Sequence, residues 1–235
     1  FDLAYSLRSS DYRGQREVQI EWLHARPAKD FIRLTEKPER FISMDCRSAA
    51  DPQASLLTWA RAGDALVWAE GSAQLPVETR KRHELEPANN LIVWTPPPSR
   101  ALLLSVIQTV SPQRVIFFGD QIVEDRPQPF LSRLAGLVRY CLSERKGWVK
   151  VEELAAATAQ TEQAIRLGLA WLAASGHITR VSPPSDAVKY VTGGFNHPAD
   201  LQKIEKELTI LLGETAAFRS YYLRADLTDF VAPEA

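Results

Sequence analysis

Residues 91–118 read LIVWTPPPSRALLLSVIQTVSPQRVIFF, in which two apolar runs flank a helix-like segment. The runs at residues 91–95 and 115–118 lack alternating polar residues, as expected for strands that are covered on both faces. Between them, residues 99–110 are long enough for about three helical turns. A strand, a helix and a second strand in this order predict a β-α-β unit with parallel strands.

The same pattern continues on the N-terminal side of this unit. Further apolar runs lie at residues 41–45 and 65–69, and helix-like segments follow them at residues 52–62 and 78–85. Asp51 and Pro52 suit the N-cap and the first position of the earlier helix. Because strands and helices alternate, residues 29–125 are predicted to form a Rossmann-like α/β domain around a parallel sheet.

On the C-terminal side the pattern becomes typical of a winged helix. Residues 130–142 place apolar side chains on one stripe of a helix. Two more helices are expected at residues 151–157 and 162–174, the second ended by Gly176. Short strands are expected at residues 148–150, 178–181 and 188–191, with residues 182–186 as the wing. Residues 126–192 are therefore predicted to be a winged-helix-like domain.

The two ends of the chain complete the predicted organisation. Residues 1–7 and 16–23 are strand-like and predict a hairpin within residues 1–28, which needs a larger partner to be stable. Residues 193–235 are predicted to form a C-terminal helical segment, with an amphipathic helix around residues 201–211 and a second stretch over residues 214–224. Because the first residues read as the inside of a strand, the chain is expected to be part of a longer protein.

The charge of the chain is nearly balanced but unevenly distributed. Its 235 residues are 45% hydrophobic and carry a formal net charge of -1. Residues 126–192 hold nine Lys or Arg against five Asp or Glu, so this is the region expected to meet phosphate or an acidic peptide if the chain binds either. The sequence has neither an apolar run of about 18 residues nor a secretory leader, which predicts a cytoplasmic protein without membrane contact.

Sequence motifs for catalysis are missing. The first strand of the predicted sheet is followed by residues 45–50, which contain no glycine to bring the backbone close to a phosphate, and no nucleotide-binding P-loop occurs. Asp45 and Asp120 follow predicted strands and could hold a magnesium ion, but capping of the next turn is the favoured interpretation, as it is for Glu70. The four histidines are scattered, so no catalytic residue, metal ligand or cofactor is predicted in this chain.

Two groups of basic residues are candidates for binding. Arg80, Lys81 and Arg82 are consecutive and are predicted to contact nucleic acid. The predicted winged helix carries a second set that is predicted to contact a partner protein: Arg133, Arg139, Arg145, Lys146 and Arg166. Solvated helix faces remain the alternative for both groups. The outward side of residues 162–174 offers few of the Arg, Lys, Asn or Gln side chains that read bases, so packing or protein contact is favoured over groove binding.

The predicted N-terminal hairpin carries four short sequences: FDLAYSL at residues 1–7, DYRG at residues 11–14, VQI at residues 18–20 and ARP at residues 25–27. Together they resemble the closing strands of the OB-fold domain in bacterial RecJ-type exonucleases. In that family a strand, an acidic-aromatic turn and a second strand occur in this order. The remainder resembles the extra C-terminal domain of a subset of these enzymes, in which a Rossmann-like sheet precedes a winged-helix-like segment.

This resemblance implies a parent enzyme that removes nucleotides from the 5′ end of single-stranded DNA with manganese or magnesium, in DNA repair and recombination. The present chain would be its non-catalytic accessory region, located with the bacterial nucleoid. Expected partners are the remainder of the exonuclease, a single-strand-binding protein or a helicase. Family OB folds touch single-stranded DNA, and Tyr12, Arg13 and Arg16 could provide such contacts. The alternative is a stand-alone winged-helix module that binds nucleic acid.

Overall fold

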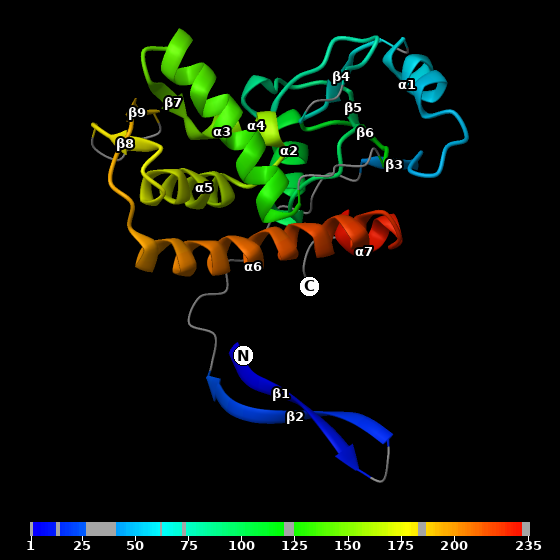
Figure 1. Ribbon diagram of the computed structural model, residues 1–235. Coiled ribbons are helices and arrows are strands. Elements are labelled where there is room, and N and C mark those ends of the chain that lie inside the picture. The colour runs from blue at the N-terminus through cyan, green and yellow to red at the C-terminus, as the bar shows by residue number, and fades with distance from the viewer. Residues whose placement is uncertain are drawn as a thin grey trace. The chain divides into compact units, whose positions relative to one another are not determined.

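The computed structural model describes residues 2–12, 15–26, 41–61, 63–71, 74–119, 125–182 and 187–231. The chain divides into two compact units, Phe1–Glu39 and Arg40–Ala235 (Figure 1). The first unit contains strands β1 (Asp2–Tyr12) and β2 (Gln15–Arg26), which pair antiparallel with Leu7 opposite Ile20. The predicted hairpin is thus present, with longer strands than expected, while its assignment to an OB fold stays a prediction.

The second unit begins with a parallel sheet of four strands. These are β3 (Ile42–Asp45), β4 (Ala65–Trp68), β5 (Asn90–Val93) and β6 (Arg114–Phe117), in the order β3-β6-β5-β4. All three neighbouring pairs are parallel, as the sequence predicted. The helices between the strands include α1 (Pro52–Ala60) and α2 (Arg100–Val110), which are capped by Asp51 and Ser99. This arrangement is α/β and compatible with a Rossmann-like fold.

Both faces of the parallel sheet are covered by apolar side chains. Leu91 and Val93 of β5 face α2 and contribute to one core, whereas Ile92 faces the opposite way and contributes to another with Leu56 of α1. All four of these side chains are fully buried. The continuous apolar runs of the sequence therefore correspond to strands without a solvent face.

The prediction of a helix at residues 78–85 is wrong. Only a short 3-10 helix, η1 (Arg82–Glu84), forms in this segment. Arg80 instead joins the edge of the sheet, because its N–H donates to the carbonyl of Val67 at 2.8 Å and its carbonyl accepts from the N–H of Ala69 at 3.2 Å. Pairing with the free edge of β4 satisfies backbone groups that a helix would have satisfied internally.

The next part of the second unit combines three helices with a small antiparallel sheet. The helices are α3 (Pro127–Glu144), α4 (Val151–Thr158) and α5 (Glu162–Ala174), and the strands are β7 (Trp148–Lys150), β8 (Ile178–Arg180) and β9 (Ala187–Thr192). The sheet order is β7-β9-β8, so β9 is central. The wing predicted at residues 182–186 lies, apart from Ser182, outside the described residues.

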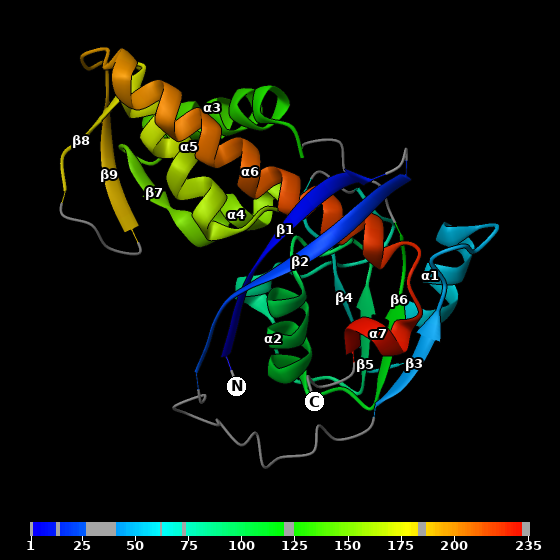
Figure 2. The same cartoon turned by 90° about the horizontal axis from the view of Figure 1, so that it is seen from below.

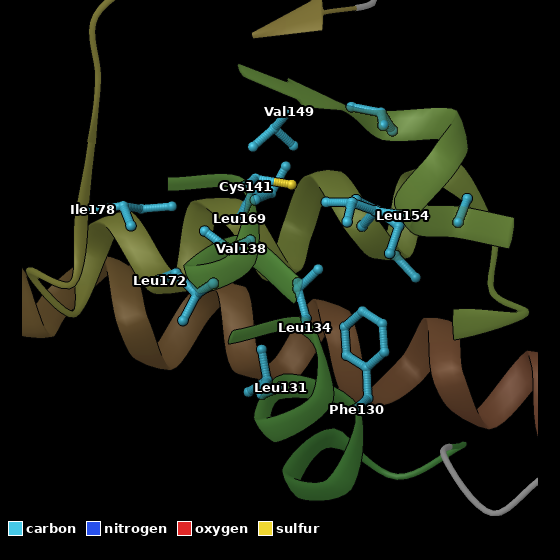
Figure 3. Packing of buried hydrophobic residues seen from close by; sticks show 14 of the residues in the cluster. Phe130, Leu131, Leu134, Val138, Cys141, Val149, Leu154, Leu169, Leu172 and Ile178 are labelled. Atoms are coloured by element: carbon cyan, nitrogen blue, oxygen red, sulfur yellow. The ribbon is translucent and has the colours of Figure 1, made fainter. Parts of the chain in front are cut away.

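The helices and the antiparallel sheet share one apolar core, shown in Figure 3. Phe130 and Leu134 of α3 are fully buried and lie against α5 at Gly168. A Cβ atom at Gly168 would lie 2.3 Å from Cδ2 of Leu134, so the absence of a side chain permits the close approach of the two helices. Gly176, with a φ of +76°, follows the end of α5 as predicted.

A single long helix, α6 (Pro198–Tyr222), stands where two helical stretches were predicted, and α7 (Leu227–Val231) follows it. Leu208 and Leu212 of α6 are buried in the core of the antiparallel part, whereas Tyr222 is buried in the core beneath the parallel sheet. Figure 2 shows α6 running past both parts of the unit. None of the described helices, α6 included, combines the length and the apolar character needed to cross a membrane.

Candidate interaction surface

The carboxyl ends of the parallel strands carry residues that contact one another. Asp45 accepts hydrogen bonds from the Arg47 backbone N–H at 3.0 Å and from its Nε and Nη2 at 2.9 and 2.7 Å. Arg47 also donates to the carbonyls of Tyr222 and Ala225, the latter at 2.9 Å. Asp45 thereby orients an arginine that binds the end of α6, whereas Asp120 lies outside the described residues.

Asp45 gives the second unit a small dependence on acid pH. Its hydrogen bond from the Arg47 side chain holds the pKa of Asp45 below the usual range, against the opposing effect of burial. A lowered pKa contributes stability that is complete above about pH 4 and is lost as the pH falls through the folded-state value. The Asp45→Asn variant is expected to lose less stability between pH 7 and pH 3 than the wild type, by a few tenths to about 1 kcal/mol, in urea unfolding.

A matched control for this pH experiment is Asp51→Asn at the start of α1. Asp51 accepts a hydrogen bond from the N–H of Ala54 at 2.9 Å, and asparagine caps helices about as well as aspartate. This variant keeps the cap and should therefore match the wild type in stability at pH 7. An Asp45→Asn protein with the same acid loss as the wild type would show that the contact with Arg47 contributes nothing to stability.

Glu70, at the end of β4, is a buried carboxylate with a full set of partners. It accepts from Trp68 Nε1 at 3.0 Å and from Arg82 Nε at 2.8 Å, and Arg82 Nη2 binds its second oxygen. The hydroxyl of Thr95 bridges the Glu70 backbone, accepting from its N–H at 3.0 Å and donating to its carbonyl at 3.1 Å. This constellation links β4, β5 and η1 and is typical of a structural ion pair.

Intramolecular contacts also engage the rest of the Arg80-Lys81-Arg82 group. Lys81 Nζ donates to the carbonyl of Ala69 at 2.6 Å, and burial lowers the pKa of this lysine. The Arg80 side chain is more exposed than that of Arg82 and lies 2.9 Å from Glu78 and 4.0 Å from Glu86. Their contact with nucleic acid stays a prediction, but the contacts described favour a structural role for Lys81 and Arg82.

The hairpin residues proposed for DNA contact can be placed only by their backbone. Tyr12 pairs with Gln15 at the end of the hairpin, and Arg16 pairs with Asp11. Arg13 lies outside the described residues. Their role stays a prediction.

Three of the five cations predicted for partner binding lie on the last two turns of α3 or directly after it. Arg139, Arg145 and Lys146 are exposed, and the Arg145 guanidinium carbon lies 5.8 Å from the ring centre of Tyr140, which is itself 54% exposed. Cations at a helix C-terminus also interact favourably with its dipole. We name Arg139, Tyr140, Arg145 and Lys146 the α3-end cluster.

The other two predicted cations lie apart from this cluster. Arg133 is half-buried and donates to the carbonyl of Ala157 at 2.6 Å, which ties α3 to α4. Arg166 lies on α5 and forms an exposed ion pair with Glu162 at 3.1 Å. Since the remaining exposed α5 residues include Gln163 and Ala170, the outward side of α5 offers few groups that could read bases.

A second exposed surface lies on the antiparallel sheet next to the α3-end cluster. The alternation in β7 is clear, because Val149 is fully buried while Trp148 is 47% exposed and Lys150 is exposed. Lys189 of β9 pairs directly with Trp148, and Val191 continues the same side of β9. We name Trp148, Lys150, Val181, Lys189 and Val191 the outer sheet face.

One carboxylate connects the two surfaces. Glu153 binds Arg145 of the α3-end cluster and lies 3.0 Å from Nζ of Lys150 on the outer sheet face. Burial would raise the pKa of Glu153, but the hydrogen bonds from these two cations outweigh it and hold the pKa below its usual range. Glu153 is therefore ionised at neutral pH and offsets part of the local positive charge.

Two cavities lie elsewhere in the second unit. One of about 370 Å³ is bounded by η1, α2 and the first residues of α4 and α5, with Ser99, Thr109, Glu152 and Glu162 among its lining. The other, of about 550 Å³, lies between α5, β8 and the first turns of α6, beside the highly exposed Phe195. Within the described part of the chain, no three His, Cys, Asp or Glu side chains are grouped so that they could bind a metal ion.

Sequence reasoning missed the outer sheet face. The signal for half of it was present, because the order Trp-Val-Lys at residues 148–150 has the period of two that places Trp148 and Lys150 on one side. The pairing of Trp148 with Lys189 could not be read in the same way, since it depends on which strands become neighbours.

Comparisons of the chain with protein-family models, with curated proteins and with solved structures gave no significant match.

Proposed function

We propose that this chain is the C-terminal accessory region of a RecJ-type exonuclease that degrades single-stranded DNA from the 5′ end. The paired strands β1 and β2 support this proposal, because the family-like sequences at residues 2–7 and 18–20 lie on them. Cleavage, with its manganese or magnesium, would belong to the other domains of the parent enzyme. The described residues would contribute to DNA repair and recombination at the bacterial nucleoid by binding a partner protein or by helping to hold DNA.

The second unit would be the binding module of this accessory region. The order α3, β7, α4, α5, β8 and β9 is that of a winged helix, and we interpret it as one. Winged-helix proteins that read DNA present a helix rich in polar and basic groups. The outward side of α5 offers few such groups, Gln163 and the ion-paired Arg166, which favours a protein partner over the DNA major groove.

The observation that carries this function is the α3-end cluster. It presents Arg139, Arg145 and Lys146 together with the exposed ring of Tyr140. Cations beside an aromatic ring suit an acidic segment that also carries an apolar side chain. The acidic tail of a single-strand-binding protein has this chemistry. An acidic segment of a helicase could have it as well.

Fluorescence anisotropy with a labelled acidic peptide that ends in phenylalanine tests the proposed function. The 235-residue chain should bind this peptide, and the Arg139→Glu/Lys146→Glu variant should bind at least tenfold more weakly, because two attractive charges become repulsive. Lys203→Glu/Lys206→Glu on α6 is the matched control and should bind like the wild type. No anisotropy change up to hundreds of micromolar chain would contradict the proposal.

Direct DNA binding through α5 is the second candidate, favoured by the winged-helix order of elements. It predicts binding to duplex DNA that weakens steeply as salt rises, because phosphate contacts release counterions. Arg166→Ala should then reduce duplex binding. Absence of duplex binding at low salt would exclude this candidate.

A further inference from the structure

We propose that the outer sheet face binds single-stranded nucleic acid, with a base stacked on Trp148 and phosphates contacted by Lys150 and Lys189. This site deepens the proposed function and rests on it for the expectation that single-stranded DNA is at hand. It is distinct from the α3-end cluster and from α5.

The geometry of the antiparallel sheet places both lysines next to the indole. Lys150 lies two residues along the same strand, a spacing of about 6.6 Å between Cα atoms. Lys189 lies directly across from Trp148 on β9, where paired Cα atoms are about 4.5–5.5 Å apart. An aromatic plane between two cations is the arrangement by which proteins bind bases and backbone of a single strand without reading the sequence.

The indole is held on a rigid support. Val149, the next residue, is fully buried in the core shared by the helices, and Figure 3 shows it close to Cys141. The carbonyl of Gly147 accepts a hydrogen bond from the N–H of Tyr190 at 2.9 Å. Gly147 has a φ of +84°, and a Cβ atom there would lie 2.1 Å from the Tyr190 carbonyl oxygen, so only glycine lets β7 begin at this place. A fixed platform loses little entropy when a base stacks on it.

The outer sheet face exposes apolar side chains to water, which is energetically unfavourable, and it carries net positive charge. Trp148, Val181 and Val191 are 47%, 53% and 42% exposed, which is unusual for three large apolar side chains on one small sheet. Lys189 forms no ion pair with the described residues, and Lys150 shares Glu153 with Arg145. Stacking of bases would cover the apolar area, and phosphates would match the charge.

The same features suit a single strand. Trp148 has one lysine on its own strand and another directly across on β9, so phosphates on either side of a stacked base would meet a cation. A base needs only an exposed aromatic plane, and every base offers one.

Anisotropy of a fluorescent oligothymidylate of about 12 nucleotides tests the proposal at low salt. The wild-type chain should bind it, Trp148→Leu should weaken binding about 5- to 100-fold, and Lys189→Glu should weaken it at least tenfold. Glu153→Gln should strengthen binding, because Arg145 and Lys150 lose their shared counter-charge. Phe195→Leu, which changes an 85% exposed aromatic residue outside this face, should bind like the wild type.

The outcomes separate this site from the proposed function. The Arg139→Glu/Lys146→Glu variant should lose the acidic peptide but keep most of its affinity for oligothymidylate, whereas Trp148→Leu should do the reverse. Failure of peptide binding alone would overturn only the proposed function. The site is overturned if the wild type does not bind oligothymidylate, if Trp148→Leu binds it as well as Phe195→Leu does, or if Trp148→Leu loses the peptide instead. Thermal unfolding of each variant verifies that its fold is intact.

Discussion

Replacing Arg219 by methionine is expected to lower the free energy of unfolding of the second unit by about 3–5 kcal/mol. Arg219 is only 5% exposed and lies near the end of α6. Its Nε donates to the carbonyl of Pro96 at 3.1 Å, and its two other nitrogens bind Asp125 and the carbonyl of Ala159. The guanidinium of Arg219 on α6 thus contacts three other segments: the residues after β5, the start of α3 and the end of α4.

The loss is large because methionine fills the space but donates no hydrogen bond to Asp125 or to the two carbonyl groups. Asp125 also accepts a 2.7 Å hydrogen bond from Gln160 Nε2, but its side chain is only 14% exposed and would lose its charged partner in a largely buried position. An uncompensated buried charge is the main cost of breaking such a pair. Urea unfolding followed by circular dichroism measures the effect.

Arg224→Met is the control for this substitution. Arg224 lies just beyond α6, and its side chain donates to the carbonyl of Ser220 at 2.9 Å from an exposed position. Its replacement should change stability by no more than about 0.5 kcal/mol. If Arg219→Met were as mild as Arg224→Met, the junction between the two parts of the unit would not depend on this arginine.

Arg82→Met is expected to cost about 3–5 kcal/mol through the carboxylate that it leaves behind. The Glu70 and Arg82 side chains are 1% and 8% exposed, and without the guanidinium Glu70 retains the indole N–H of Trp68 and the 3.3 Å contact with the Arg82 N–H. The double variant Glu70→Leu/Arg82→Met removes the charge as well and should recover much of the stability, because buried pairs can often be replaced by apolar residues at little cost.

Arg80→Met provides the neighbouring control. Its side chain is 39% exposed, and its partners Glu78 and Glu86 are more exposed still, so the expected loss is at most about 1 kcal/mol. Equal losses for Arg80→Met and Arg82→Met in thermal or urea unfolding would contradict the structural role assigned to the pair of Glu70 and Arg82.

The parallel sheet could be predicted because its signals are local. Strands buried on both faces need continuous apolar runs, and residues 91–95 and 115–118 show them directly. The helices between the strands carry their own caps at Asp51 and Ser99. The order of the strands in the sheet has no such local signal, since it depends on contacts between distant segments.

The continuity of α6 could not be predicted for a related reason. Gly213 lies between the two predicted stretches, and glycine costs about 1 kcal/mol in a helix. In the structure, Leu212 on one side of Gly213 is anchored in the core around α3 and α5, and Tyr222 on the other side is anchored beneath the parallel sheet. Packing at both ends outweighs the local penalty.

The residues of the candidate site also differ in whether the sequence could identify their role. The cations of the α3-end cluster could be named from their density in the sequence, since Arg139 lies on one helix and Arg145 and Lys146 directly follow it. The burial of Arg82 could not, because its carboxylate partner lies on another strand end and nothing in Arg80-Lys81-Arg82 distinguishes the paired arginine from the exposed one. The density of charged residues in a sequence indicates where cations lie, but not which of them already form ion pairs within the protein.

The central claim is that this chain binds and does not cleave. It is tested most directly by incubating the purified 235-residue chain with 5′-labelled single-stranded DNA in the presence of manganese or magnesium, and following the length of the DNA on a denaturing gel alongside its anisotropy. The account predicts a bound oligonucleotide of unchanged length. Progressive shortening of the DNA by the chain alone, unaffected by further purification, would contradict it.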